Sequence, residues 1–324
     1  MSRIGFHAGH EMFAPSALLE FVKLAERAGF GEAMCSDHFH PWIPSQGHSG
    51  FAWSWLGAAL QATSLPFGTV NAPGQRYHPA IVAQAVATLA EMFPGRIWLA
   101  AGTGEALNES ITGDDWPHKQ ARRERLKECV DVMRALWRGE TVTHAGKHVR
   151  VKEAKLYTRP RPRPAEAPKL FGAALTTETA KWVGGWADGL ITVAKEPDDL
   201  KEAITAFREG GGGGKPIFVQ AAISYARDEA DAVEAAHRNW PMAGLEIPML
   251  GDLPTPEAFA RACAGVRREE VKEKLRVSSD LSRHRDWIAR DLELGASRVY
   301  LQYLGPDMRA FIEVFGEKVV GEFS

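Results

Sequence analysis

Short apolar runs alternate with amphipathic stretches along the whole chain. Eight runs rich in apolar and β-branched residues are expected to form strands, and they occupy residues 3–6, 32–37, 65–70, 96–102, 169–174, 188–194, 216–225 and 297–304. Between them, apolar residues recur every three or four positions, as on amphipathic helices, in stretches such as 16–30, 79–93, 122–137 and 283–296. Eight alternating strand and helix units predict a parallel sheet that closes into one (β/α)8 TIM barrel domain over residues 1–324.

Two segments interrupt this alternation and are predicted to be insertions at about 141–168 and 241–280. The first alternates polar and apolar residues around an Ala-Gly turn and ends in prolines, which predicts a hairpin followed by an extended linker. The second is polar and is expected to be partly helical. Barrels place their chemistry at the carboxyl ends of the strands, and insertions on that rim form pocket walls. The glycine run 210–214 lacks the spacing of a phosphate-binding P-loop, which favours a flexible loop at the opposite rim.

Composition excludes several classes of protein. The chain has 324 residues, of which 45% are hydrophobic and 25% charged, and its formal net charge is -2. This balance gives no electrostatic reason to expect binding of nucleic acid or of an anionic membrane surface. The sequence has no apolar segment typical of a signal peptide and no run of eighteen apolar residues, so a cytoplasmic location is predicted. Cys35, Cys129 and Cys263 are far apart, which favours reduced thiols.

The stretch from Ser36 to Trp42 follows the second predicted strand and contains Asp37, His38 and His40. These residues therefore leave the strand on the face where barrels carry out chemistry. His38 and His40 are two positions apart and could form a metal-binding pair. The later strand ends contain no histidine that would complete such a site, so a metal ion is disfavoured relative to an acid/base site or a cofactor pocket.

A second segment rich in small residues, 100–109, follows the fourth predicted strand. Small residues let the backbone approach a flat ligand closely, and Glu105 would then lie at the mouth of the barrel. The same residues also suit a helix entrance, with Thr103 near the N-cap and Glu105 facing the helix dipole. This segment alone does not decide between the two interpretations.

Taken together, these two segments, residues 10–15 (HEMFAP) and residues 76–80 (RYHPA) occur in the order and spacing of one family. The chain resembles the F420-dependent glucose-6-phosphate dehydrogenase group of the luciferase-like hydride transferases. The resemblance covers nearly the whole length, is dense to about residue 140 and thins in the second insertion. It implies a homodimeric barrel that holds coenzyme F420, an 8-hydroxy-5-deazaflavin that accepts a hydride at ring carbon C5.

The resemblance also implies which residues hold the cofactor. The deazaflavin and its ribityl chain would be lined by Asp37, Thr103, Gly104, Glu105 and Asn108. Val70 and Asn71 match the place where the family has a non-proline cis peptide against the ring. The cofactor phosphate would meet N–H groups at a helix start, formed by Ala174, Leu175, Thr176 and Thr177, where the family has glycines in place of Leu175 and Thr176.

The predicted catalytic set is His38, Glu105, Glu11 and Trp42. Removing a hydride from a carbinol carbon requires loss of the hydroxyl proton as well, and an imidazole such as that of His38 suits this task. Glu105 would place a protonated or proton-sharing carboxyl beside the pyrimidine side of the cofactor. Glu11 would be a second carboxyl of the pocket, and two neighbouring carboxylates push one pKa upward. Trp42 would wall the site and exclude water.

The predicted substrate contacts depart from the family pattern. Lys195 and Lys274 match two of the three cations that family members use to bind a sugar phosphate, whereas the third position falls in 246–256, where no cation occurs. Loss of a charged phosphate contact weakens a site, so we predict a dehydrogenase acting on an alcohol or sugar hydroxyl. Glucose 6-phosphate remains the alternative substrate. An FMN-dependent monooxygenase, a metal-dependent hydrolase and a non-catalytic deazaflavin carrier are the alternative functions.

Overall fold

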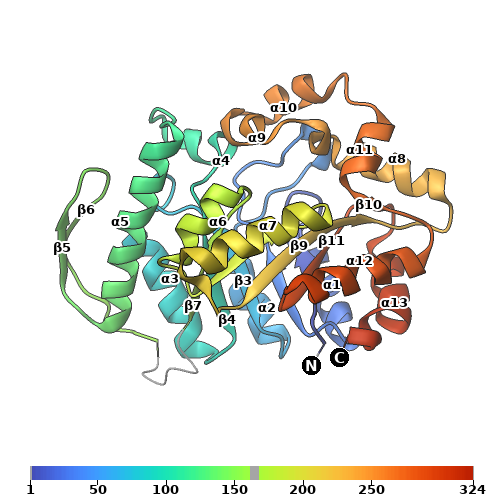
Figure 1. Cartoon of the computed structure of the whole chain (residues 1–324). Coiled ribbons are helices and arrows are strands. Elements are labelled where there is room, and N and C mark those ends of the chain that lie inside the picture. The colour runs from blue at the N-terminus through green and yellow to red at the C-terminus, as the bar shows by residue number, and fades with distance from the viewer. Residues whose placement is uncertain (1, 161–167, 324) are drawn as a thin grey trace.

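The computed structural model describes residues 2–160 and 168–323 and shows a closed parallel barrel with helices around it (Figure 1). The eight barrel strands, in chain order, are β1 (Ile4–Ala8), β2 (Glu32–Cys35), β3 (Phe67–Asn71), β4 (Ile97–Ala101), β7 (Lys169–Ala173), β8 (Gly189–Val193), β9 (Ile217–Ser224) and β11 (Arg298–Tyr303). Neighbouring strands pair in this order, and pairing of β8 with β9 and of β11 with β1 closes the ring. All eight predicted strands and the predicted barrel are therefore confirmed.

Helices cover the outside of the barrel (Figure 1). They are α1 (Pro15–Arg27), α2 (Ala52–Ala62), α3 (Pro79–Met92), α5 (Lys119–Arg138), α6 (Thr177–Gly184), α7 (Pro197–Phe207), α8 (Glu229–Asn239), α12 (Leu281–Leu294) and α13 (Met308–Lys318). One large apolar cluster fills the layer between strands and helices and includes Ile4 and Phe6 of β1 with Leu18 and Val22 of α1. The three cysteines are buried and free, as predicted. None of the helices in the described ranges has the length and apolar character needed to span a membrane.

The lower part of the barrel interior is filled by large side chains. Met34, Trp98, Phe171, Phe218 and Tyr300 form a second buried cluster with smaller neighbours. Glycine is required opposite Tyr300, because a Cβ atom on Gly5 would lie 2.2 Å from the Tyr300 ring. One layer nearer the carboxyl ends of the strands, Val70, Ala173 and Gln220 are only partly buried and 36% of Val193 is exposed. The barrel is thus closed below and open at its carboxyl-end mouth.

Both predicted insertions are present. The first forms an antiparallel hairpin of β5 (Val142–Ala145) and β6 (Arg150–Ala154). Most of its predicted proline-rich linker, residues 161–167, lies outside the described residues. The second contains η4 (Pro241–Gly244), α9 (Ile247–Asp252), α10 (Pro256–Cys263), α11 (Arg268–Lys274) and β10 (Arg276–Val277). Its helices α9 and α10 lie across the upper end of the barrel in Figure 1.

The glycine run differs from the open loop that was predicted. Residues Arg208–Gly212 form a π-helical turn, η3, that packs against α6. A Cβ atom on Gly210 would lie 1.8 Å from the carbonyl oxygen of Lys181, so glycine is needed here for close backbone packing.

A candidate active site at the barrel mouth

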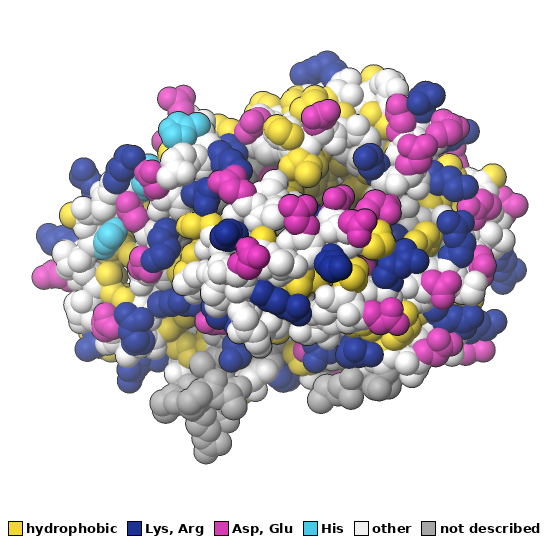
Figure 2. Space-filling view, in the orientation of Figure 1, with side chains coloured by type: hydrophobic (Ala, Val, Ile, Leu, Met, Phe, Trp, Pro, Cys, Tyr) yellow, Lys and Arg dark blue, Asp and Glu magenta, His cyan; other side chains and the backbone are white. Residues whose placement is uncertain are grey.

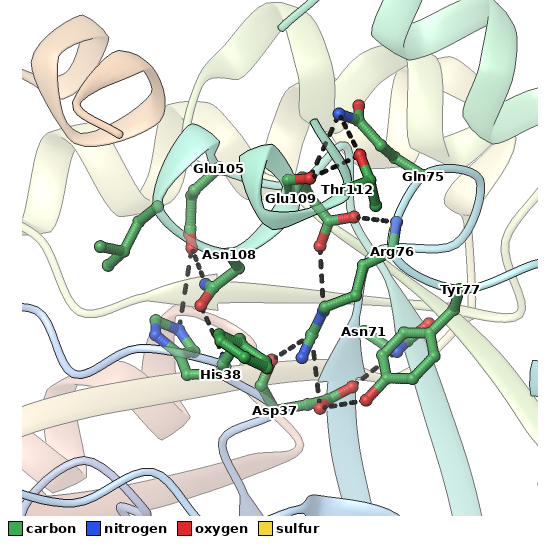
Figure 3. Close-up of polar contacts among 12 residues, drawn as sticks. Asp37, His38, Asn71, Gln75, Arg76, Tyr77, Glu105, Asn108, Glu109 and Thr112 are labelled. Carbon is green, nitrogen blue, oxygen red and sulfur yellow. Dashed lines mark hydrogen bonds and ion pairs between the residues drawn. The ribbon is translucent and has the colours of Figure 1, made fainter. Parts of the chain in front are cut away.

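His38 lies between two carboxyl groups that come from different loops. Its Nδ1 atom is 3.5 Å from Glu11 Oε1, and its Nε2 atom is 3.7 Å from Glu105 Oε2. Glu11 follows β1, His38 follows β2, and Glu105 follows β4. Figure 3 shows His38 facing Glu105. Closure of the barrel therefore brings together three of the four predicted catalytic residues.

Glu11 is fixed on the side away from His38. The Ser36 hydroxyl donates to Glu11 Oε2 at 2.8 Å, and the backbone N–H of His10 donates to Ser36 Oγ at 2.9 Å. Burial opposes ionisation of Glu11, but His38, a backbone N–H group and Ser36 together hold the pKa of the Glu11 carboxyl below its ordinary value. Glu11 is thus an ionised partner for the His38 ring at neutral pH.

Glu105 is held by an amide and has the opposite pKa shift. Asn108 Nδ2 donates to Glu105 Oε2 at 3.1 Å, while Asn108 Oδ1 accepts the backbone N–H of Phe39 at 2.9 Å. Although 33% of its side-chain surface is exposed at the mouth, the surrounding protein excludes enough water that burial raises the pKa of Glu105, with His38 opposing that rise. The two carboxyl groups beside His38 therefore have pKa values shifted in opposite directions, and for Glu105 burial contributes more to the rise than the charge of Glu11 does.

Trp42 is the fourth predicted catalytic residue and is buried beside His38. The two rings have centroids 5.1 Å apart with 51° between their planes. On its other side, Trp42 packs against Trp240, at 6.0 Å, and against Phe259, at 5.2 Å. Met242, Cys263 and Leu250 belong to the same apolar cluster. The second insertion thus forms an apolar wall behind the histidine.

Asp37 belongs to a buried polar network next to the site (Figure 3). Its carboxylate accepts hydrogen bonds from Asn71 at 2.6 Å and from Tyr77 at 3.1 Å, and it lies 3.4 Å from the Arg76 guanidinium. Arg76 also donates to the backbone oxygen of Asp37 at 2.8 Å and lies 3.4 Å from Glu109 Oε1. This network anchors the loop that carries His38.

His40 lies on the rim, where its Nδ1 atom is 2.9 Å from the backbone oxygen of Leu107. The ring of His40 also meets Phe39 edge-on, with centroids 4.9 Å apart. Within the described part of the chain, no group of three or more His, Cys, Asp or Glu residues is arranged to hold a metal ion. His38 and His40 thus have different surroundings.

The predicted cofactor residues lie on the ends of β3, β4 and β7. Val70 faces the open mouth, and Gly104 has φ +80°, a conformation that favours glycine. Thr103 precedes Gly104 in the loop that leads to α4 (Ala106–Glu109) and is partly buried. A cis peptide bond was expected at Val70–Asn71. This expectation is wrong, because the described peptide bonds are all trans. Both residues stay paired in register with Ala100 and Ala101 of β4, so the strand runs on regularly through this point.

The segment predicted to hold the cofactor phosphate lies at the start of α6. Thr176 is the N-cap and accepts from the N–H of Thr179 at 3.3 Å, and Thr177 begins the helix. Ala174 is buried and its N–H donates to Ile191 O at 3.0 Å, whereas Leu175 is 39% exposed. Leu175 therefore turns an apolar side chain to solvent beside the mouth.

The predicted substrate cations are not equivalent. Lys195 is partly buried at the end of β8, where its ammonium donates to the backbone oxygen of Leu175, and burial lowers its pKa. Lys274 is exposed at the last residue of α11, a helix that packs on α8 and η4. Four other cations of the second insertion are paired with acids: Arg267 with Glu270, Arg268 with Glu234, Lys272 with Glu229, and Arg276 with Asp291.

Figure 2 shows a hollow between the α9–α10 segment and α7, with hydrophobic side chains on its visible walls. Acidic side chains gather along its lower edge, over α7, whose first turn carries Asp198 and Asp199. An apolar opening with an acidic edge suits an uncharged ligand better than an anion.

Comparison with known proteins identifies the family. Residues 1–297 match the luciferase-like monooxygenase family. This chain belongs to that family. It is 34% identical to an F420-dependent glucose-6-phosphate dehydrogenase of Microbacterium testaceum, over 98% of this chain and 96% of that protein. A protein of the same description from Mycolicibacterium smegmatis is also 34% identical, over 97% of this chain and 95% of that one.

A solved luciferase-like structure is similar over almost the whole chain. It is an F420-dependent secondary alcohol dehydrogenase in complex with an F420-acetone adduct, and it is 34% identical with a TM-score of 0.90, covering 98% of each chain. These relatives confirm the predicted resemblance and the barrel.

Sequence reasoning missed the residues that support this luciferase-like site. Ser36 and Arg76 both lie in quoted segments, 36–42 and 76–80, but their roles depend on contacts with Glu11, Asp37 and Glu109, which are distant in sequence. The one local signal for these supporting residues is an arginine between two apolar elements. A guanidinium that is buried there needs acidic partners, so it predicts acids nearby in the fold.

Proposed function

We propose that this protein is an F420-dependent dehydrogenase that oxidises the carbinol group of an uncharged alcohol or sugar. The observation that carries the proposal is the placement of His38 between Glu11 and Glu105 at the open mouth of the barrel. Two carboxyl groups with opposite pKa shifts next to one imidazole form an acid/base site. The F420 dependence of the relatives supports the choice of cofactor.

The residues at the mouth fit a flat deazaflavin. Val193 and Leu175 expose 36% and 39% of their surface there. A Cβ atom on Gly102 would touch Ala173 only at 3.5 Å and Val70 at 4.0 Å, so this side of the mouth is lined by small groups. The deazaflavin would be held by Asp37, Val70, Asn71, Thr103, Gly104, Glu105 and Asn108, and its phosphate by residues 174–177. When bound, F420 supplies a hydride acceptor at ring carbon C5.

His38 is the proposed base. Ionised Glu11 faces Nδ1, which favours the tautomer with hydrogen on that atom and leaves Nε2 free to accept the hydroxyl proton. The positive charge that this transfer places on the ring is stabilised by Glu11. Loss of the proton from oxygen and of a hydride from carbon leaves a carbonyl product. The raised pKa of Glu105 favours a protonated carboxyl group beside the bound deazaflavin ring. Trp42 excludes water from the site.

The pairing of lysine and arginine side chains in the second insertion favours an uncharged substrate. Four cations of the second insertion already have acidic partners, and residues 246–256 contribute none. Glucose 6-phosphate is the second candidate, because several relatives are dehydrogenases of that substrate. An FMN-dependent monooxygenase is a third, because of the family to which the chain belongs.

Titration of the purified protein with F420, FMN and NADP tests the cofactor. We expect micromolar or tighter quenching with F420 and no appreciable binding of the other two, since no GxGxxG turn follows a strand. Preference for FMN would contradict the proposal. Binding of F420 without turnover in a screen of alcohols and sugars would indicate a carrier. The homodimer implied by the resemblance stays a prediction. Light scattering, which measures the molar mass in solution, tests it.

A further inference from the structure

Two glutamine side chains meet inside the barrel mouth. Gln220 Nε2, from β9, donates to Gln302 Oε1, from β11, at 2.9 Å. Side chains alternate between the two faces of a strand, and the residues two positions earlier, Phe218 and Tyr300, belong to the cluster that fills the barrel interior. Gln220 and Gln302 therefore point inward as well, one layer closer to the mouth.

The glutamine pair faces the proposed cofactor from across the barrel. In the ring of eight strands, β9 and β11 stand opposite β3 and β4, which carry Val70 and Gly102. On its other side β11 pairs with β1, where Gly5 is in register with Tyr300. His7, two residues after Gly5, thus lies at the level of Gln302, on the strand that leads to Glu11. The pair is on the arc of the barrel that adjoins the acid/base site.

The pair offers unused hydrogen-bonding groups at the mouth. Gln302 is only 4% exposed and Gln220 is partly buried. Their mutual bond uses Gln220 Nε2 and Gln302 Oε1, and within the described residues no hydrogen bond involves the Gln302 amide nitrogen or the Gln220 side-chain oxygen. Together these atoms present one acceptor and one N–H2 donor, which complement a hydroxyl or a carbonyl group.

The charged and titratable groups near the pair are Lys195 and His7. The Lys195 ammonium, at the end of β8, already donates to the backbone oxygen of Leu175. His7, the neighbouring titratable group on β1, is kept neutral because burial lowers its pKa to about 4, although Glu11 opposes this shift. Val70 of β3 and Ala173 of β7 are apolar, as is Val193 of β8, which is in register with Gln220. These walls suit an uncharged group.

We propose that Gln220 and Gln302 form a subsite for a second uncharged hydrogen-bonding group of the substrate, a hydroxyl or carbonyl on the carbon next to the carbinol. This subsite rests on the proposed function and narrows its substrate class to vicinal diols and hydroxyketones. It differs from the acid/base site, because it recognises the substrate without moving a proton.

Comparison of 2,3-butanediol with 2-butanol as substrates, with F420 as acceptor, tests the subsite. Wild type should have a kcat/KM for the diol about tenfold or more above that for the simple alcohol, since a site built to bond a hydroxyl discriminates against the analogue that lacks it. Two variants, Gln302→Leu and Gln220→Leu, should each remove most of this preference by lowering kcat/KM for the diol alone. Gln220 is the less buried of the two residues. Gln61→Leu, on the exposed face of α2, is the matched control and should change neither value.

Four outcomes would overturn the subsite. Equal losses on both alcohols would mean that the pair only supports the barrel, and a weaker affinity for F420 in either variant would assign it to the cofactor. No preference for the diol in wild type would also exclude it while leaving the proposed function intact. Turnover of neither alcohol, nor of any other uncharged alcohol or sugar, would remove the proposed function and the subsite together.

Discussion

The chemistry of His38 is set by residues that are far from it in sequence. Glu11 faces one ring nitrogen and Glu105 the other, while Ser36 and Asn108 fix the two carboxyl groups from outside. Ser36 binds one oxygen of Glu11 and leaves the other facing His38, whereas Asn108 donates to the same Glu105 oxygen that faces the imidazole. The His38 site therefore consists of five side chains on three loops, and each can be tested alone.

Replacement of His38 by alanine should lower kcat by about a hundredfold or more, because general base catalysis typically contributes 10²- to 10⁴-fold. The affinity for F420 should change little. His40→Ala is the control, since His40 is bonded to the Leu107 carbonyl on the rim, and it should have a much smaller effect. Steady-state kinetics and fluorescence titration measure both. Equal losses that added zinc restores would instead support a metal site.

The raised pKa of Glu105 predicts a pH dependence. A raised pKa means that the carboxyl group keeps its proton to higher pH than usual and loses it as the pH rises further. The proposed function needs the protonated form, so kcat should fall on the alkaline side as Glu105 ionises. Glu105→Gln stays neutral at every pH and should lose this alkaline limb in a kcat profile from pH 5 to 10. An unchanged limb would show that another group causes it.

Local sequence identified the residues that act but not those that hold them. His38, Glu105 and Trp42 follow strand ends, a position that a single sequence reveals once the barrel is recognised. The partners of Asp37 come from one other strand and its loop, Asn71 at the end of β3 and Arg76 after it, 34 and 39 residues away. Their pairing depends on how the loops fold over the mouth, which no local pattern contains.

At the scale of elements, the strands were predictable and the insertions only partly so. The barrel strands are apolar runs separated by amphipathic helices, and this alternation leaves few other folds. The π-helical turn at Arg208–Gly212, which includes the start of the glycine run, was not predictable, because its tight packing on α6 depends on the absence of a side chain at Gly210 rather than on a pattern. In the second insertion, helices of six to eight residues, α9, α10 and α11, are too short for periodicity to define.

Helix α9 is tied to the rest of the rim by one acid. Asp252 Oδ1 accepts from Trp116 Nε1 and from Arg122 Nη1, both at 3.0 Å, and Arg122 also lies over the Trp116 ring at 4.6 Å. The Asp252 side chain is 60% exposed, and such exposed pairs contribute about 1 kcal/mol or less to stability. The contact therefore positions α9 rather than holding the fold together.

Asp252→Ala should accordingly shift Tm by no more than about 2 °C but raise KM for the alcohol roughly threefold or more at nearly constant kcat. The reason is that α9 belongs to the wall behind Trp42, through Leu250. Asp131→Ala is a matched control, because Asp131 is 59% exposed and pairs with Lys127 on α5. Equal KM values in the two variants would show that α9 does not shape the substrate site.

At the scale of the whole molecule, the barrel brings groups from opposite strands to one mouth. Glu11 and His38 follow β1 and β2, Glu105 follows β4, and the glutamine pair lies on β9 and β11. Most of the proposed cofactor residues lie at the ends of β3, β4 and β7. The second insertion adds an apolar cluster beside Trp42, and four of its cations are paired with acids, whereas Lys274 is exposed. On the face shown in Figure 2, the hollow beside the second insertion has apolar walls and an acidic lower edge.

The last prediction concerns a phosphorylated substrate and tests this distribution of charge. Glucose 6-phosphate should be oxidised with a kcat/KM well below about 10⁴ M⁻¹s⁻¹, the lower end of the usual range for enzymes. The reason is that Arg267, Arg268, Lys272 and Arg276 already pair with acids, and a phosphate would have to compete for them. Steady-state kinetics with glucose 6-phosphate, and with glucose as the uncharged control, measure the difference.

Lys195→Ala and Lys274→Ala complete this test. Lys195 already donates to the Leu175 carbonyl and Lys274 is exposed at the end of α11, so neither variant should raise KM for glucose 6-phosphate steeply. A wild-type value at or above about 10⁴ M⁻¹s⁻¹ that collapses in either variant would show a working phosphate clamp. That result would make glucose 6-phosphate the substrate, because a clamp contributes its charge to binding and its loss appears in KM.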